Sequence, residues 1–279
     1  MTGPARARAG GRERLDRLLV DRGHARSRER AQALVLAGRV RVDGKPAGKP
    51  GVPVPKTASI EIIEPDHPFV GRGGVKLDGA LSRLGIDPRG CVALDIGAST
   101  GGFTDCLLRR GAGRVFALDV GSGLLDWTLR NDPRVVVLEG RNARHLAPAD
   151  LPGQVDLVVI DVSFISLRLI LPVVQALLAP GGAIVALVKP QFEVGRKDVG
   201  RGGIVRDPRL HGKALESVAA AAQALGLAVL GGCPSPITGA EGNREFFLHL
   251  MPGAATAAPA LTELLGGIVD DRHAEAPAD

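Results

Sequence analysis

The chain is poor in aromatic residues and in cysteine. It contains no Tyr, one Trp and seven Phe, and none of these precedes Phe69. An N-terminal segment without such rings does not stack unpaired bases as single-strand RNA binders do. The three cysteines, Cys91, Cys106 and Cys233, are odd in number and lack paired spacing, which argues against a disulfide framework and a structural metal site.

Long apolar runs are absent as well. No stretch reaches the roughly 18 apolar residues of a membrane span, and the arginine-rich N-terminus has no apolar signal core. We therefore expect a cytoplasmic globular protein without a membrane partner. A composition of 45% hydrophobic and 23% charged residues in 279 is sufficient for one medium domain and a smaller one.

Positive charge is concentrated in the N-terminal part. Residues 1–64 contain 14 Lys and Arg against 7 Asp and Glu, whereas the rest of the chain contains 21 against 23. A basic module joined to a near-neutral one indicates a polyanion-binding domain attached to an enzyme, with a merely solvated surface as the alternative.

Breaks in periodicity divide the chain into segments. Residues 1–11 are Arg, Ala and Gly without periodicity, which predicts a disordered basic arm. We expect a small α+β domain over 12–64, a linker over 65–72, a larger domain over 73–252 and a flexible tail over 253–279. In the small domain the spacing predicts two short helices, between Arg12 and Gly23 and between Ser27 and Gly38, followed by a hairpin at 40–45 and a strand at 59–62.

Strand and helix patterns alternate in the larger domain. The predicted strands lie at 92–94, 114–118, 135–138, 156–160, 183–188 and 246–250, and the predicted helices at 104–110, 167–178 and 210–225. This alternation is typical of an α/β fold with a mostly parallel sheet covered on both faces, in which ligands bind at the carboxyl ends of the strands. We expect the single tryptophan, Trp127, to pack in the core.

The sequence Asp-Ile-Gly-Ala-Ser-Thr-Gly-Gly-Phe at residues 95–103 follows a strand and precedes a helix. Its glycines permit a tight turn and close approach of backbone to a ligand. Three residues separate Gly97 from Gly101, and an aspartate stands two before the first glycine, so the loop departs from the dinucleotide fingerprint and favours S-adenosylmethionine over NAD. An ordinary glycine turn is the alternative.

Polar residues fall at other strand ends. Asp119 comes roughly 20 residues after the loop begins, where a carboxylate meets ribose hydroxyls, and Asn142 is placed to contact an adenine edge or to cap its own loop. The candidate cofactor-binding residues are Asp95, Gly97, Ser99, Gly101, Gly102, Phe103, Asp119, Asn142 and Asp161.

Two lysines need an explanation. Lys189 ends the fifth predicted strand, where a buried ammonium is costly without partners, and Lys76 lies on the helix before the sheet. A lysine serves as general base when its pKa falls, and a neighbouring cation and desolvation both lower it, whereas nearby carboxylates raise it. We assign Lys189 as a general base and leave its pKa open.

The basic module resembles a known RNA-binding domain. The segments 26–30 and 38–45 are similar to the small domain of ribosomal protein S-four. The resemblance implies binding of structured RNA through phosphates and shape. The candidate RNA-binding residues are Arg26, Arg28, Arg39, Arg41 and Lys45. Merely solvated strand residues remain the alternative for Arg39 and Arg41.

Four residues of the larger domain carry a second resemblance. Lys76, Asp161, Lys189 and Glu245 match in order the Lys-Asp-Lys-Glu tetrad of RNA ribose 2′-O-methyltransferases related to FtsJ. Glu193 and Glu241 lie near enough in sequence to compete with Glu245 for the last place.

Together with the segments 71–77, 161–166 and 189–193, the tetrad makes the chain similar to the TlyA family of hemolysin-like ribosomal RNA methyltransferases from about residue 12 to 250. This resemblance implies a Rossmann-like, seven-stranded, S-adenosylmethionine-dependent methyltransferase. It further implies that the substrate is cytidine ribose in ribosomal RNA, free or in subunits. The expected mechanism requires no metal, and we infer no obligate protein partner.

Three other functions stay open. Asp161-Val162-Ser163-Phe164 faintly resembles the Asp-Pro-Pro-aromatic motif of amino-methylating enzymes, but its prolines are absent and that motif needs no lysine pair. A membrane-active hemolysin is disfavoured because the chain offers no span and no amphipathic helix with aromatic anchors. A noncatalytic RNA-binding factor is disfavoured by the intact Asp95, Gly97 and Lys189.

Overall fold

The computed structural model describes residues 11–63, 67–239 and 241–271. The chain divides into two compact units, residues 1–68 and 69–279. The predicted arm lies outside the described residues except for Gly11, as do residues 65 and 66 of the predicted linker.

The first unit has two helices and short strands around a small apolar core. Its elements are β1 (Arg12–Arg14), α1 (Leu15–Asp21), α2 (Arg28–Leu36), β2 (Val40–Val42), β3 (Lys45–Pro46), β4 (Pro53–Pro55) and β5 (Ile60–Ile62). Ser27 caps α2 by accepting a hydrogen bond from the backbone N–H of Arg30. The pair β1 and β4 was not predicted, because β4 contains two prolines and reads as a loop.

The second unit is an α/β domain. Its strands are β6 (Val92–Ile96), β7 (Arg114–Asp119), β8 (Val135–Glu139), β9 (Val155–Ile160), β10 (Leu178–Val188), β11 (Leu227–Pro234) and β12 (Phe246–Pro252). Its helices are α3 (Gly73–Leu84), α4 (Gly102–Arg109), α5 (Trp127–Arg130), α6 (Leu171–Gln175), α7 (Pro190–Glu193), α8 (Pro208–Ala224) and α9 (Ala258–Asp270).

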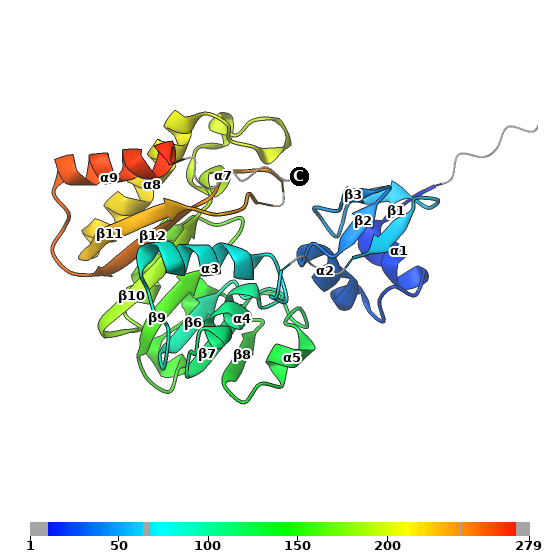
Figure 1. The fold of residues 1–279 in the computed structure, drawn as a ribbon, viewed down its shortest axis with the longest axis horizontal. Coiled ribbons are helices and arrows are strands. Elements are labelled where there is room, and N and C mark those ends of the chain that lie inside the picture. Colours follow the sequence, from blue (N-terminus) through cyan, green and yellow to red (C-terminus); the bar gives the residue numbers. More distant parts are fainter. Residues whose placement is uncertain (1–10, 64–66, 240, 272–279) are drawn as a thin grey trace, which may run out of the picture. The chain divides into compact units, whose positions relative to one another are not determined.

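These strands form one seven-stranded sheet in the order β11-β12-β10-β9-β6-β7-β8, which can be followed in Figure 1. β12 runs antiparallel to both of its neighbours, and the pairs from β10 to β8 are parallel. Side chains alternate between the faces: Leu94 and Ile96 join the apolar cluster beneath α6, α8 and α9, whereas Ala93 joins the cluster beneath α3 and α4. The predicted fold class is thereby confirmed.

One predicted helix differs from the structure, one strand was missed, and one side chain was placed wrongly. The helix expected over 167–178 is a 3₁₀ turn (Leu167–Leu169) followed by the short α6, and Leu178 already begins β10. The strand β11 was missed because a Gly-Gly pair interrupts its apolar pattern. The core placement of Trp127 was wrong, since its side chain is 71% exposed at the start of α5.

The ends of the second unit also differ from expectation. Phe69 of the predicted linker is buried, and a Cβ on Gly74 would lie 2.2 Å from its ring, so the chain is packed from residue 69 onward. Part of the predicted flexible tail is the helix α9, whose Leu265, Ile268 and Val269 are buried against the sheet. Because residues 253–279 are rich in alanine and contain only scattered charges, the apolar face of this helix was not recognised in the sequence.

Candidate active site

The loop after β6 needs glycine for steric reasons. Gly97 has φ +89°, and a Cβ there would lie 2.3 Å from the carbonyl oxygen of Asp161. Gly101 has φ +96°, and a Cβ there would lie 2.2 Å from a methyl group of Leu129. Ser99 between them also adopts a positive φ of 49°. The loop therefore runs close against the residue after β9 and against Leu129, and only glycine fits at these two positions.

Asp95 is fully buried at the carboxyl end of β6. Its Oδ2 accepts a hydrogen bond of 2.7 Å from the Thr104 hydroxyl, and its Oδ1 has no hydrogen-bond partner among the described residues. Burial raises the pKa of Asp95 to about 7, against the opposing effect of the Thr104 hydrogen bond. A buried acceptor without a donor is a feature that a ligand can satisfy.

We predict that Asp95→Asn raises thermal stability above neutral pH. When folding raises the pKa of a carboxyl, the protein loses stability as the pH increases from the unfolded pKa to the folded pKa. Ionisation of the wild-type Asp95 therefore destabilises the protein fully at pH values above about 7, whereas an amide at this position does not ionise. The melting temperature at pH 8 should exceed that of the wild type, and the gap should close toward pH 5. A gap that widened on acidification would contradict the burial argument.

Asp119 holds the glycine loop. Its Oδ2 accepts from the backbone N–H of Ser99 at 2.8 Å, and its Oδ1 from that of Gly121 at 2.7 Å. Asn142 uses its side-chain oxygen to accept from the Arg144 N–H, which is the loop-capping geometry. Glu139 at the end of β8 was missed by the sequence analysis, and it accepts from the N–H groups of Gly123 and Leu125. These residues shape the loops beside the glycine turn.

The four residues of the predicted tetrad form two ion pairs. Lys189 Nζ lies 2.5 Å from Asp161 Oδ1, and Lys76 Nζ lies 2.6 Å from Glu245 Oε2. Lys76, Lys189 and Glu245 are buried, with exposures of 8%, 9% and 4%. Burying ion pairs such as these removes both charges from water, which costs free energy. Their presence in the interior therefore favours a functional role for these residues.

The pairs influence each other electrostatically. Burial disfavours the Lys189 ammonium, but the negative charges of Asp161 and Glu245 outweigh it and raise the pKa of Lys189. Burial likewise opposes ionisation of Asp161, and the positive charges of Lys189 and Lys76 overcome it and lower the pKa of that carboxyl. Without a ligand, Lys189 is therefore an ammonium ion at neutral pH.

The competing glutamate Glu193 has another role. Its carboxylate accepts from the Ser166 hydroxyl at 2.6 Å and from the Leu167 N–H at 2.7 Å, so it holds the chain after β9. No corresponding contact with Lys76 or Lys189 is seen for Glu193 among the described residues. The geometry thus favours Glu245 as the partner of Lys76.

Two further residues at the tetrad lie in the motif after β9. Ser163 accepts a hydrogen bond of 2.9 Å from Lys189 Nζ. Phe164 is 85% exposed, has a positive φ of 64° and lies with its ring centroid 5.1 Å from that of Phe192. Positive φ at a bulky residue marks a constrained position. Sequence patterns carried no signal for this strain or exposure.

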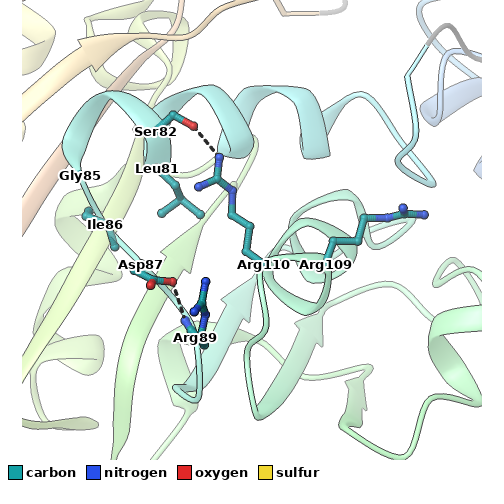
Figure 2. Close-up of a pocket in the computed structure, with 8 residues that line it drawn as sticks. All are labelled: Leu81, Ser82, Gly85, Ile86, Asp87, Arg89, Arg109 and Arg110. Carbon is teal, nitrogen blue, oxygen red and sulfur yellow. Dashed lines mark hydrogen bonds between the residues drawn. The ribbon is translucent and has the colours of Figure 1, made fainter.

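An open pocket of about 400 Å³ lies elsewhere, at the amino-terminal side of β6, lined by Leu81, Ser82, Gly85, Ile86, Asp87, Arg89, Arg109 and Arg110. In Figure 2, Arg110 points toward Ser82, and Arg109 points away from the other labelled side chains. Arg110 is paired with Asp78 and Arg109 with Asp105. Because this pocket lies before β6 and the tetrad lies at the carboxyl ends of β9 and β10, the two sites are separate.

In the first unit, one buried carboxylate gathers cations. Asp16 is fully buried and accepts from Arg14 in a bidentate contact at 3.0 and 2.8 Å, from Arg28 at 3.0 Å and from Gln32 at 3.1 Å. Of the predicted RNA-binding residues, Arg26, Arg28, Arg41 and Lys45 are exposed, and Arg39 is half-buried with its Nε on the Ile63 carbonyl. Arg14 was not identified from the sequence as a partner of Asp16.

We predict that Asp16→Asn destabilises the first unit by about 1–3 kcal/mol, since a hydrogen-bonded charge is lost from a buried site. The Arg14 guanidinium holds the pKa of Asp16 well below its usual range, so this stability is present above the unfolded pKa and is lost as pH falls. Thermal unfolding at pH 7 measures the effect. Asp21→Asn, an exposed charge on the same helix, is the control, and equal losses in both would refute the prediction.

Seven strands in this order, with an antiparallel β12 and a glycine loop after β6, define a Rossmann-like methyltransferase fold. The model of the FtsJ-like methyltransferase family matches residues 69–251, and that of the S4 domain matches residues 13–60. The chain belongs to the FtsJ-like methyltransferase family and carries an S4 domain before it.

Relatives extend over both units. The chain is 51% identical over 240 residues to the 16S/23S rRNA (cytidine-2′-O)-methyltransferase TlyA of Mycobacterium tuberculosis, covering 86% of this chain and 90% of that protein. It is 41% identical over 239 residues to Hemolysin A of Brachyspira hyodysenteriae, covering 85% and 99%. A solved structure of a candidate hemolysin from Streptococcus thermophilus matches with TM-score 0.71 and 41% identity, covering 93% of this chain and 96% of that one. The predicted TlyA resemblance is confirmed.

Proposed function

We propose that this methyltransferase transfers a methyl group from S-adenosylmethionine to a ribose 2′-hydroxyl of ribosomal RNA, at cytidine as in the TlyA relative. The observation that carries the proposal is the pair of buried lysines, each on a carboxylate, beside the glycine loop. Action on ribosomal RNA also implies a cytoplasmic location.

The residues around the glycine loop fit this cofactor. Asp95 Oδ1 is a buried acceptor without a donor among the described residues, and Gly97 and Gly101 allow the loop above it to turn tightly with positive φ. Asp119 retains lone pairs on both oxygens besides its two backbone hydrogen bonds, so it can accept from ribose hydroxyls. Once bound, the cofactor supplies an electrophilic methyl group on a sulfonium.

Lys189 acts in the proposal as the group that takes the 2′-hydroxyl proton. Methyl transfer needs the hydroxyl oxygen in line with the methyl group while its proton leaves. Ser163 and Asp161 orient the Lys189 amine, and the Lys76 pair with Glu245 holds a second cation nearby. Because the pKa of Lys189 is raised, its ammonium must first release a proton to solvent, and only the neutral amine can then accept the proton of the 2′-hydroxyl.

We predict that the rate of methyl transfer rises with pH. Because the pKa of Lys189 is raised above its ordinary value, the fraction of enzyme with a neutral Lys189 amine increases with pH and is still increasing at neutral pH. Single-turnover rates at saturating substrate should increase between about pH 7 and pH 9, with a slope near one in log rate. A flat profile over this range would remove Lys189 as the base.

The first unit supplies RNA binding in this proposal. Its S4 domain match and its exposed Arg26, Arg28, Arg41 and Lys45 support contacts with phosphates of structured RNA. Phe164, exposed beside Ser163, adds an aromatic surface on which the target base can stack. Ribosomal RNA, free or in subunits, is the proposed partner.

Lysis is the competing function that relatives' names raise, since one is Hemolysin A. Within the described ranges, no helix has both the length and the apolar character of a membrane span. The lysine and carboxylate pairs have no role in membrane damage, so we favour methyl transfer. Leakage of dye from liposomes treated with the pure protein would support lysis.

The decisive experiment is methyl transfer from labelled S-adenosylmethionine to ribosomal subunits and to their free RNA, followed by alkaline hydrolysis. A 2′-O-methyl group blocks cleavage of the adjacent phosphodiester, so the expected label is in alkali-resistant dinucleotides. Label released as mononucleotides would show base methylation, including the amino-methyl alternative. No incorporation into any RNA would favour a noncatalytic binding factor.

A further inference from the structure

The C-terminal helix α9 lies beyond residues 69–251, the part that matches the family model. Its inner side chains are buried, and β11 accommodates it through Gly232, where a Cβ would lie 2.4 Å from a terminal methyl of Ile268. In Figure 1, α9 lies near α8 and β11. The helix is therefore an integral part of the second unit.

The end of α9 is bound to the segment that carries Glu245, directly before β12. The guanidinium of Arg244, the residue before Glu245, donates to the carbonyl of Val269 at 3.2 Å and to that of Asp271 at 3.1 Å. These carbonyls belong to the last turn of α9 and the residue after it, where helix carbonyls lack intrahelical donors and a cation is favourable. Arg244 thus caps α9 from the segment directly before β12.

The same end of α9 is bound to the helix that carries Lys76. The carboxylate of Asp271 is paired with Arg83 of α3. Residues 76 and 83 are seven positions apart, about two helical turns, and so lie on similar faces of α3. Arg83 is 41% exposed and Asp271 19%, so this pair lies nearer the surface than the pair of Lys76 and Glu245.

Besides the apolar packing of Leu77 and Leu81 in the cluster that includes Phe247, two polar connections among the described residues join α3 to the start of β12. One is the direct ion pair between Lys76 and Glu245, and the other runs from Arg83 through Asp271 to Arg244. Among the described residues, α3 has no backbone hydrogen bond to the sheet, so its position along β12 depends on side-chain packing and on these polar contacts. A lysine on α3 keeps its place at Glu245 only if the helix neither slides nor rotates.

We propose that the C-terminal end of α9 is a brace that positions Lys76 against Glu245, with Asp271 as its central positioning residue. The brace rests on the proposed function for its effect on rate, but not for its effect on α3. Loss of the Asp271 charge releases Arg83, and α3 gains freedom at the end opposite the Lys76 pair.

The test compares Asp271→Asn with Asp271→Glu and with the control Asp132→Asn. Asp132 is matched in exposure, at 21%, and pairs with an arginine two residues away instead of bridging elements. Hydrogen exchange of residues 73–84 and the kcat and KM of RNA methylation are measured per folded enzyme, below the melting temperature of every variant.

For Asp271→Asn we expect faster exchange in α3 and a kcat roughly threefold to tenfold lower, because small misplacements of catalytic groups are costly, with both KM values unchanged. Asp271→Glu should restore both. Exchange and kcat equal to those of Asp132→Asn would overturn the brace, as would faster exchange with normal kcat. A wild type inactive on all RNA would refute the proposed function, and the exchange of α3 would still test the brace.

Discussion

Lys189→Ala is expected to reduce methyl transfer about 10³-fold, within the range of positioned general bases. The amine lies 2.5 Å from Asp161 Oδ1 and 2.9 Å from Ser163 Oγ, so it is held in one place at the carboxyl end of β10. Alanine removes the proton acceptor and leaves the Asp161 charge without its partner. Single-turnover transfer to RNA measures the loss, and calorimetry of S-adenosylmethionine binding should show a much smaller change.

Lys189→Arg is the matched variant. It keeps the positive charge beside Asp161 but cannot lose its proton at accessible pH. If Lys189 served only to pair with Asp161, the arginine variant would retain most of the activity. If it is the base, both variants should be inactive and the arginine variant should be the more stable one. Full activity in either would refute the assignment.

Gly97→Ala is expected to weaken cofactor binding strongly and, with it, methyl transfer. Two costs add at this position. The backbone has φ +89°, which an L side chain rarely adopts, and the new Cβ would lie 2.3 Å from the carbonyl oxygen of Asp161. Because that oxygen is backbone, the glycine loop or the end of β9 must move. We expect affinity for S-adenosylmethionine to fall at least about 100-fold, as for other displaced binding groups.

Gly85→Ala separates the two costs. Gly85 ends α3 with φ +66°, and nothing lies within 4 Å of a Cβ placed there. The substitution therefore carries the conformational cost of about 1 kcal/mol without the clash. The variant should bind cofactor like the wild type and melt slightly lower. If Gly97→Ala also bound the cofactor like the wild type, the close approach of the loop to Asp161 would not matter for cofactor binding.

Much of the fold followed from local patterns. Asp95, Asp119, Asp161 and Lys189 were predicted at the carboxyl ends of strands, and each comes at or directly after such an end. Alternating short strands and helices specify a parallel sheet, and a parallel sheet brings its strand ends to one edge. Elements with irregular composition, such as β4 with its prolines and β11 with its paired glycines, could not be recognised in this way.

Pairings between distant residues were beyond sequence reasoning. Glu193, Glu241 and Glu245 were all possible partners for a lysine, and only the packing of α3 against the sheet puts Lys76 on Glu245. Asp16 reads as a first-turn helix residue, and only the folded unit collects Arg14, Arg28 and Gln32 around it. Side-chain partners separated by many residues depend on the geometry of the whole domain.

By itself the sequence determined the fold class, the glycine loop, the basic first unit and the family, since periodicity, glycine positions and motif order are local properties of the chain. The tertiary structure decided the two ion pairs of the tetrad, the orphaned acceptor on Asp95, the exposed Phe164 and the brace from α9. The physical reason is that burial, charge partners and backbone strain arise only when segments far apart in sequence pack together.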